Sequence, residues 1–230
     1  MKFQYRTIKM MFLFLSGTTC VKQDIVYMVD SSSYVGSTNF YVQLQFIKDN
    51  IKYYNLDPQC TRISIVTYSN AVTNHFYLNE YSSRTELYNA IDAIKYMPGS
   101  GSYSYEAINY AYQNSFTSEH GGRTGVAHYG ILVTGSTSSS SSMSINAAGQ
   151  AKQSGMILST VGIGSGISQG ELNGIATSER NQFTSQNYNS LTTVAEPLAT
   201  RINGGESVET IVCFNASHYS VISNRRKNVI

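Results

Sequence analysis

The sequence predicts an α/β domain: a doubly wound, mostly parallel six-stranded sheet with one antiparallel edge strand and helices on both faces. Short apolar, β-branched runs alternate with segments of helical spacing, which is typical of parallel strands joined by helices. Right-handed crossovers between such strands place helices on both faces of the sheet. The chain of 230 residues can bury one substantial core but is short for two. We therefore expect one domain over 20–203, a signal peptide over 1–19 and a C-terminal extension or tail over 204–230.

The first half of the chain begins with a buried strand and a helix. The apolar run that ends at Asp30 is the strand, and Phe40, Leu44 and Ile47 follow at helical spacing. A hairpin then supplies the antiparallel edge strand. The expected order is strand, helix, strand, hairpin strand, helix and helix over residues 24–30, 39–53, 62–68, 71–78, 84–96 and 105–116.

The second half repeats the alternation with a serine tract inside it. Residues 126–134 form a buried strand, and the low-complexity run Ser136 to Ser142 that follows predicts a flexible loop. An alanine-rich segment then predicts a helix. The expected order from there is helix, strand, helix, short strand and helix over residues 144–154, 155–162, 169–176, 182–185 and 190–203.

The most informative stretch is Asp24-Ile-Val-Tyr-Met-Val-Asp30-Ser-Ser32, where an apolar strand ends at an aspartate and a row of hydroxyls. In an open α/β sheet, ligands bind at the carboxyl ends of the strands. Carboxylate and hydroxyl oxygens are ligands that magnesium prefers. The stretch therefore predicts a candidate cation site; the alternative is that Asp30 and Ser32 only cap a turn or the next helix.

The ends of the chain favour secretion. Lys2, Arg6 and Lys9 precede the apolar run Met10 to Leu15 and a group of small residues, which is the order of a secretory signal. No other stretch approaches the ~20 apolar residues of a membrane span. The Asn215-Ala-Ser217 sequon also fits an exported protein.

Three cysteines, Cys20, Cys60 and Cys213, lie far apart and lack the paired spacing of a zinc site. In a secreted protein we expect one disulfide and one remaining thiol. A bridge between Cys20 and Cys213 would tie the two ends of the domain together, but the sequence leaves the pairing open.

Composition excludes some classes of partner. The formal net charge is +2 and only 13% of residues are charged, so nothing indicates binding to nucleic acid or to an anionic membrane. The 18 tyrosines suit contact recognition, because the ring supplies area and the hydroxyl supplies a hydrogen bond.

From about Cys20 to Asn203 the chain resembles a von Willebrand factor type A domain of the collagen VI and matrilin type. The resemblance rests on five further segments in order, in addition to the Asp24–Ser32 stretch: Arg62-Ile-Ser-Ile-Val-Thr-Tyr-Ser69, Ala107-Ile-Asn-Tyr-Ala111, Gly122-Arg-Thr-Gly125, Val161-Gly-Ile-Gly164 and Glu171-Leu-Asn-Gly-Ile-Ala176. It implies a non-enzymatic, secreted interaction module that binds collagen or other matrix proteins.

The resemblance also implies a metal-ion-dependent adhesion site, which this chain matches only in part. Asp30 and Ser32 fill the first two places of the D-x-S-x-S loop, Tyr34 stands in the third, and Ser102 takes the threonine place. The usual T-D-G reads Thr134-Gly135-Ser136, so the second aspartate is missing. We expect weak magnesium binding or none at Asp30, Ser32 and Ser102, because one carboxylate does not neutralise a divalent ion. Ser31, Ser33 or the serines of 136–142 could add hydroxyl ligands.

Three functions follow as hypotheses. The first is a matrix-binding module with weak or no metal dependence, the second a magnesium-dependent adhesion domain, and the third a self-associating structural component of the matrix. Proteins of this family usually carry several such modules, so the chain could also be one part of a longer protein.

Enzymatic alternatives have less support. Gly162-Ile-Gly164-Ser-Gly166 follows a strand, but its spacing is not that of a dinucleotide site. There is no G-x-S-x-G nucleophile elbow. Cys60 would need a base that the sequence does not identify, and we expect a buried thiol there. The histidines are expected in surface or packing roles: His75, His120, His128 and His218.

Overall fold

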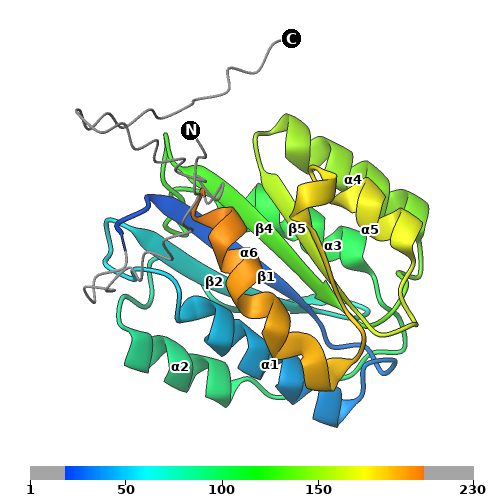
Figure 1. Cartoon of the computed structure of the whole chain (residues 1–230). Helices are drawn as coiled ribbons and strands as arrows, with labels where there is room; N and C mark the ends of the chain where they lie inside the picture. The colour runs from blue at the N-terminus through cyan, green and yellow to red at the C-terminus, as the bar shows by residue number, and fades with distance from the viewer. Residues whose placement is uncertain (1–18, 205–230) are drawn as a thin grey trace, which may run out of the picture.

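The structure is a computed structural model that describes residues 19–204. It contains one six-stranded sheet with the strand order β3-β2-β1-β4-β5-β6 (Figure 1). The strands are β1 (Gln23–Asp30), β2 (Thr61–Tyr68), β3 (Val72–Phe76), β4 (Ala127–Thr134), β5 (Ile157–Ile163) and β6 (Gln182–Ser185). Residues 1–18 of the expected signal peptide, residues 205–230 of the expected tail, Cys213, the Asn215 sequon and His218 lie outside the described residues.

The pairing of the strands confirms the predicted fold class. β1 is parallel to both β2 and β4, and β4–β5 and β5–β6 are also parallel pairs. β3 is antiparallel to β2 and forms one edge. The strand order therefore runs outward in opposite directions from β1 and β4, and the switch point, where open α/β sheets bind ligands, lies between these two strands.

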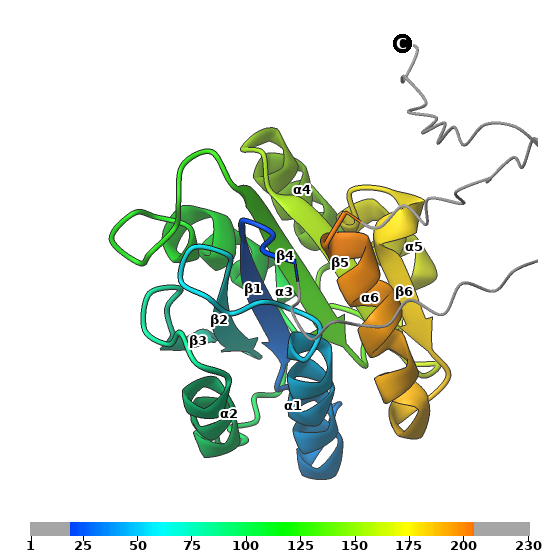
Figure 2. The same ribbon diagram turned by 60° about the vertical axis from the view of Figure 1, so that its left-hand side comes forward.

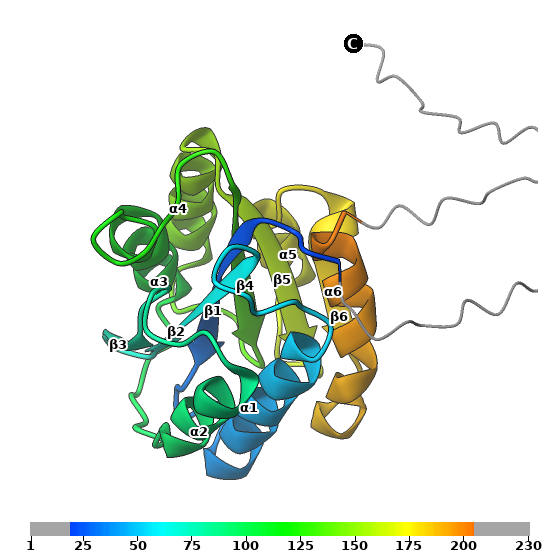
Figure 3. The same cartoon turned by 90° about the vertical axis from the view of Figure 1, so that its left-hand side faces the viewer.

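Helices cover both faces of the sheet, as Figure 1, Figure 2 and Figure 3 show from three sides. One face carries α1 (Ser37–Ile51), α2 (Arg84–Ala93) and α6 (Ala195–Ile202). The other carries α3 (Ser104–Tyr110), α4 (Ser141–Gln153) and α5 (Gln169–Ile175). Shorter helical turns are η1 (Ala111–Ser115), η2 (Glu179–Asn181) and η3 (Tyr188–Val194).

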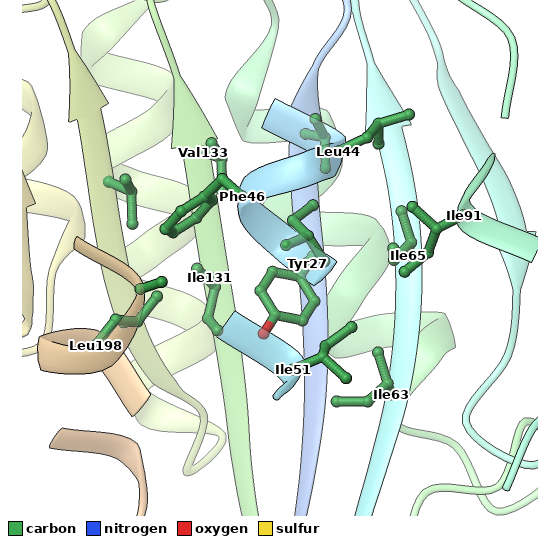
Figure 4. Packing of buried hydrophobic residues seen from close by; sticks show 14 of the residues in the cluster. Tyr27, Leu44, Phe46, Ile51, Ile63, Ile65, Ile91, Ile131, Val133 and Leu198 are labelled. Carbon is green, nitrogen blue, oxygen red and sulfur yellow. The ribbon is translucent and has the colours of Figure 1, made fainter. Parts of the chain in front are cut away.

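β1 is buried along its whole length because helices cover both of its faces. Its side chains alternate between two hydrophobic cores. Tyr27 and Val29 face α1 and α6, whereas Val26 and Met28 face α3 and α4. Figure 4 shows Tyr27 at the centre of the first core, among side chains from α1, β2 and β4. The same alternation turns Asp30, at the end of the strand, toward the face that carries α3 and α4.

Several element boundaries differ from the predicted ones. The helix expected over 84–96 ends at Ala93, because Ile94 is extended (φ −65°, ψ 125°) although its side chain stays buried. The helix expected over 105–116 is α3 followed by the π-helical turn η1, and the one expected over 190–203 is the 3-10 turn η3 followed by α6. In each segment the apolar residues were predicted correctly, but part of the backbone that carries them is not α-helical.

The serine tract is ordered by hydrogen bonds, contrary to the predicted flexible loop. Ser138 Oγ and Ser139 N donate to the carbonyl of Ser102 (3.0 and 2.8 Å). The buried carboxylate of Glu171, from α5, accepts from Ser138 N (3.1 Å) and Ser141 Oγ (2.7 Å). Ser141 is already the first residue of α4. Glu171 therefore provides a negative charge and hydrogen-bond acceptors at the start of this helix, which both favour it.

The disulfide joins Cys20 to Cys60. The buried free thiol expected at Cys60 is therefore wrong, and so is the alternative bridge from Cys20 to Cys213. The bond ties the segment before β1 to the turn before β2, and those two strands are neighbours in the sheet. A disulfide at this place fits a protein folded in an oxidising compartment.

One arginine links several segments at the end of the sheet where β1 and β2 begin. Arg123 donates to Asp24 Oδ1 through Nε (2.9 Å) and Nη2 (2.7 Å), and its backbone N–H donates to Asp24 Oδ2 (2.8 Å). The same guanidinium donates to the carbonyls of Gln23, Gln59 and Cys60. Asp24 has a fully buried side chain, so its charge depends mainly on Arg123, while His128 Nε2 lies farther away, at 3.6 Å from Oδ2.

We predict that Arg123→Ala lowers the free energy of unfolding by about 3 to 5 kcal/mol, because it leaves the Asp24 charge buried without its partner. Adding Asp24→Asn to this variant should restore part of the loss. Lys22→Ala is the matched control, since Lys22 is exposed in the same segment. Urea unfolding measures all four proteins, and a loss no larger than that of Lys22→Ala would refute the role of Arg123.

We also predict that Glu171→Ala destabilises the protein by about 1 to 3 kcal/mol, because a buried N–H of Ser138 loses its acceptor. Amide exchange at 138–141 should accelerate more than exchange in the sheet. Glu171→Gln, which keeps an acceptor oxygen, should have a smaller effect. Glu179→Ala, at an exposed glutamate, is the control. Unchanged exchange at 138–141 in Glu171→Ala would show that Glu171 does not order the serine tract.

Candidate functional site

The candidate site lies at the carboxyl ends of β1 and β4, at the switch point of the sheet. Asp30 ends β1 and is fully buried. The backbone carbonyl of Asp30 accepts a hydrogen bond from Gln43 Nε2 of α1 (3.1 Å). The next turn is fixed to β2, because Ser31 N donates to the carbonyl of Tyr68 (2.8 Å). The backbone around Asp30 is therefore fixed by α1 and β2, two neighbouring elements.

Four donors of the protein satisfy the Asp30 carboxylate. The N–H of Ser32 donates to Oδ1 (2.9 Å). Three hydroxyls donate to Oδ2: Ser102 Oγ (3.1 Å), Thr134 Oγ1 (2.9 Å) and Ser136 Oγ (2.9 Å). Hydrogen bonds to the ionised form stabilise it, so a buried carboxylate here does not require a cation.

The structure brings the three residues proposed from the sequence to one place but gives them different roles. Ser102 contacts Asp30 directly. Ser32 is buried beside it, and its Oγ has no hydrogen-bond partner among residues 19–204. Tyr34, in the third place of the loop, is 66% exposed. A hydroxyl that would point into the site in the family pattern is thus replaced by an aromatic ring on the surface.

Two phenols border the carboxylate. Tyr68 ends β2 and is buried, and burial together with the negative charge of Asp30 raises its pKa well above the usual value. The hydroxyls of Thr134 and Ser102 partly oppose this increase. Tyr188, the first residue of η3, also has a pKa raised by burial and by Asp30. Both phenols are therefore neutral at ordinary pH.

The donor set does not fit a divalent cation well. Asp30 is the one carboxylate among the atoms that contact the hydroxyls of Ser102, Thr134 and Ser136. Glu171 is directed to the serine tract instead. Within residues 19–204, no group of three or more His, Cys, Asp and Glu side chains is arranged to hold a metal ion. The unpartnered Ser32 Oγ is a feature that a magnesium ion would improve.

Sequence reasoning missed the two phenols and gave Glu171 no role. Tyr68 could have been found, because it ends the predicted strand beside β1 and is the register partner of Asp30. Tyr188 could not, because it lies in a helical turn after a short strand and reaches the site only through the tertiary fold. Thr134 and Ser136 were identified by the tripeptide in which the second aspartate is missing.

The residues considered for enzymatic roles have packing roles in the structure. A Cβ on Gly162 would overlap Leu172 of α5, so this glycine allows the close approach of α5 to β5. His120 stacks on Tyr77 and His128 on Phe116. His75 bonds Thr67 Oγ1 (2.9 Å), and burial lowers its pKa.

Two exposed apolar side chains flank the candidate site. Tyr34 is 66% exposed and Met97 is 72% exposed. A hydrogen bond from Ser33 N to the carbonyl of Gly99 (2.8 Å) joins the two loops that carry them. We call Tyr34 and Met97 the rim. Among the described residues, no helix is long and apolar enough to cross a membrane.

Comparison with known proteins places these features in a family. The profile of the von Willebrand factor type A domain matches residues 24–197. Matrilin-2 of Mus musculus is 28% identical over 180 residues, which are 76% of this chain and 18% of that protein. Matrilin-1 of Gallus gallus is 25% identical over 189 residues, 81% of this chain and 38% of that protein. The chain thus spans about a fifth to two fifths of these relatives.

Solved structures agree on the fold. Proximal thread matrix protein 1 from the mussel byssus has a TM-score of 0.75 at 22% identity, over 80% of this chain and 48% of that chain. A second structure of that protein, with a zinc-occupied MIDAS motif, has a TM-score of 0.74 at 23% identity, over 81% of this chain and 47% of that one. The profile match covers most of the chain. The chain therefore belongs to the von Willebrand factor type A domain family.

Proposed function

We propose that this chain is a non-enzymatic protein-binding module of the extracellular matrix, with collagen or another matrix protein as its partner. The domain spans 20–203, and the protein is secreted. The matrilin relatives support the matrix setting, and the Cys20–Cys60 disulfide supports an oxidising compartment.

Binding by this module depends little or not at all on a divalent cation. The observation that carries this part of the proposal is the Asp30 carboxylate, which already accepts one N–H and three hydroxyls of the protein. A cation would have to displace these donors and would meet a single negative charge. Magnesium gives up its water shell reluctantly, so this exchange is unfavourable.

The rim is the proposed contact surface. Exposed aromatic and thioether side chains bury large areas with few polar atoms to desolvate. The Asp30 carboxylate is buried and hydrogen-bonded, so an acidic group of the partner is not needed to complete a metal site. A contact surface built on such side chains suits a partner that is recognised by shape and apolar area.

A magnesium-dependent adhesion domain remains the second candidate, and Ser32 favours it. The buried Ser32 Oγ lacks a partner, and with Asp30 and Ser102 it would supply one carboxylate and two hydroxyl ligands. A self-associating matrix component is the third candidate. Sedimentation of the full chain over a range of concentrations separates it from the first two, because only self-association makes the mass depend on concentration.

We predict that binding to purified collagens and matrix glycoproteins persists in EDTA with less than about a twofold change in Kd, since the contact contains no metal bridge. Surface plasmon resonance with the full chain, in EDTA and in millimolar magnesium, measures this. Loss of binding in EDTA, with recovery on adding magnesium, would establish the second candidate. If the chain binds none of these matrix proteins and self-associates, the third candidate is established.

We predict that Tyr34→Ala and Met97→Ala each weaken this binding by at least about tenfold, as truncation of central contact residues does. Tyr53→Ala is the matched control. Tyr53 is 40% exposed but follows the far end of α1, away from the candidate site. Equal effects of Tyr34→Ala and Tyr53→Ala would move the contact surface away from the rim.

A further inference from the structure

Tyr188 reaches the candidate site from the last part of the fold. It follows β6 and begins η3, which contacts α1 and α6, and its ring packs against the core on that side of the sheet. Its hydroxyl is buried and has no hydrogen-bond partner among the described residues. Because an unpaired buried hydroxyl is costly, its position calls for an explanation.

The hydroxyl of Tyr188 lies against Gly135. A Cβ built on Gly135 would overlap the Tyr188 hydroxyl oxygen, and the ring carbon that bears this oxygen would lie 3.0 Å from the same Cβ. Gly135 is not one of the glycines with positive φ, so its backbone does not require glycine. The space does. Any side chain at position 135 would have to displace Tyr188.

Position 135 is where the family pattern places the second aspartate of the adhesion site. The side chains on both sides of it, Thr134 and Ser136, already donate to Asp30 Oδ2. The negative charge of Asp30 also raises the pKa of Tyr188, after burial, so the phenol lies within the field of this carboxylate. The neutral phenol thus fills the space that the first side-chain carbon of an aspartate at position 135 would need.

We propose that Tyr188 determines the metal preference of this site: its hydroxyl fills the space beside Gly135 and keeps the site at one negative charge. The inference rests on the proposed function, because it explains why that function is independent of metal. The inference extends the proposed function, because it assigns the exclusion of the metal ion to two positions, 135 and 188, and not only to the missing aspartate.

The pair makes a specific double variant informative. Gly135→Asp/Tyr188→Ala supplies both a second carboxylate and the room for it. We expect saturable Mn²⁺ binding below about 1 mM, measured from the electron paramagnetic resonance signal of free Mn²⁺. The thermal midpoint should also rise with Mn²⁺, because the ion binds only the native state. Wild type, Tyr188→Ala and Gly135→Asp should bind at least about tenfold more weakly.

Two results would overturn the inference. One is a folded double variant that binds Mn²⁺ no better than Tyr188→Ala. The other is Gly135→Asp alone binding as well as the double variant, since Tyr188 would then not block the space. Saturable binding by the wild-type protein would refute the proposed metal independence instead.

A second comparison needs neither metal nor the charged variant to fold. Gly135→Ala should lower the thermal midpoint of the wild-type protein but lower it much less in a Tyr188→Ala background, since the overlapping group is gone. Gly149→Ala is the control: it lies inside α4, a Cβ there meets nothing within 4 Å, and it should stabilise the protein. Equal losses for Gly135→Ala in both backgrounds would show that Tyr188 does not constrain position 135.

Discussion

The structure depends on how a charge is satisfied at the end of its most buried strand. β1 is covered on both faces, and Asp30 continues the buried series at the switch point. An isolated carboxylate in such a place would be strongly destabilising. Here the loops after β1 and β4, and the segment before α3, converge on it with one N–H and three hydroxyls. The hydrogen bonds that satisfy Asp30 therefore also position the loops at the carboxyl ends of the strands.

The hydroxyl network extends beyond Asp30. Ser102 donates to Asp30 through Oγ, and its carbonyl accepts from Ser138 and Ser139. Ser138 in turn donates to Glu171. Two buried carboxylates are thus linked by serine side chains and backbone groups, and neither has a cationic partner in this network. Serine suits this role because one small side chain can donate to a carboxylate and accept from a neighbour.

Sequence reasoning predicted the fold well because the sheet is buried on both faces and its strands are therefore plainly apolar. The strand ending at Asp30, which is buried along its whole length, was found for this reason. The helical C-terminus of the domain was predicted less well, since the apolar stripe does not distinguish a 3-10 turn at Tyr188 from an α-helix. The serine tract was misjudged because its order comes from Glu171, a partner distant in sequence. Asp30 was found from its place at the end of a strand and Ser102 from the family resemblance, whereas Tyr188 enters the site only through the tertiary fold.

The central claim is that hydrogen bonds, and not a cation, satisfy Asp30. Calorimetric titration of the metal-stripped wild-type protein with magnesium and then manganese tests it most directly. The account predicts no saturable heat at concentrations up to the millimolar range, because binding would exchange four protein donors for a poorly neutralised ion. Saturable binding in that range, lost in Asp30→Ala while the variant stays folded, would contradict it.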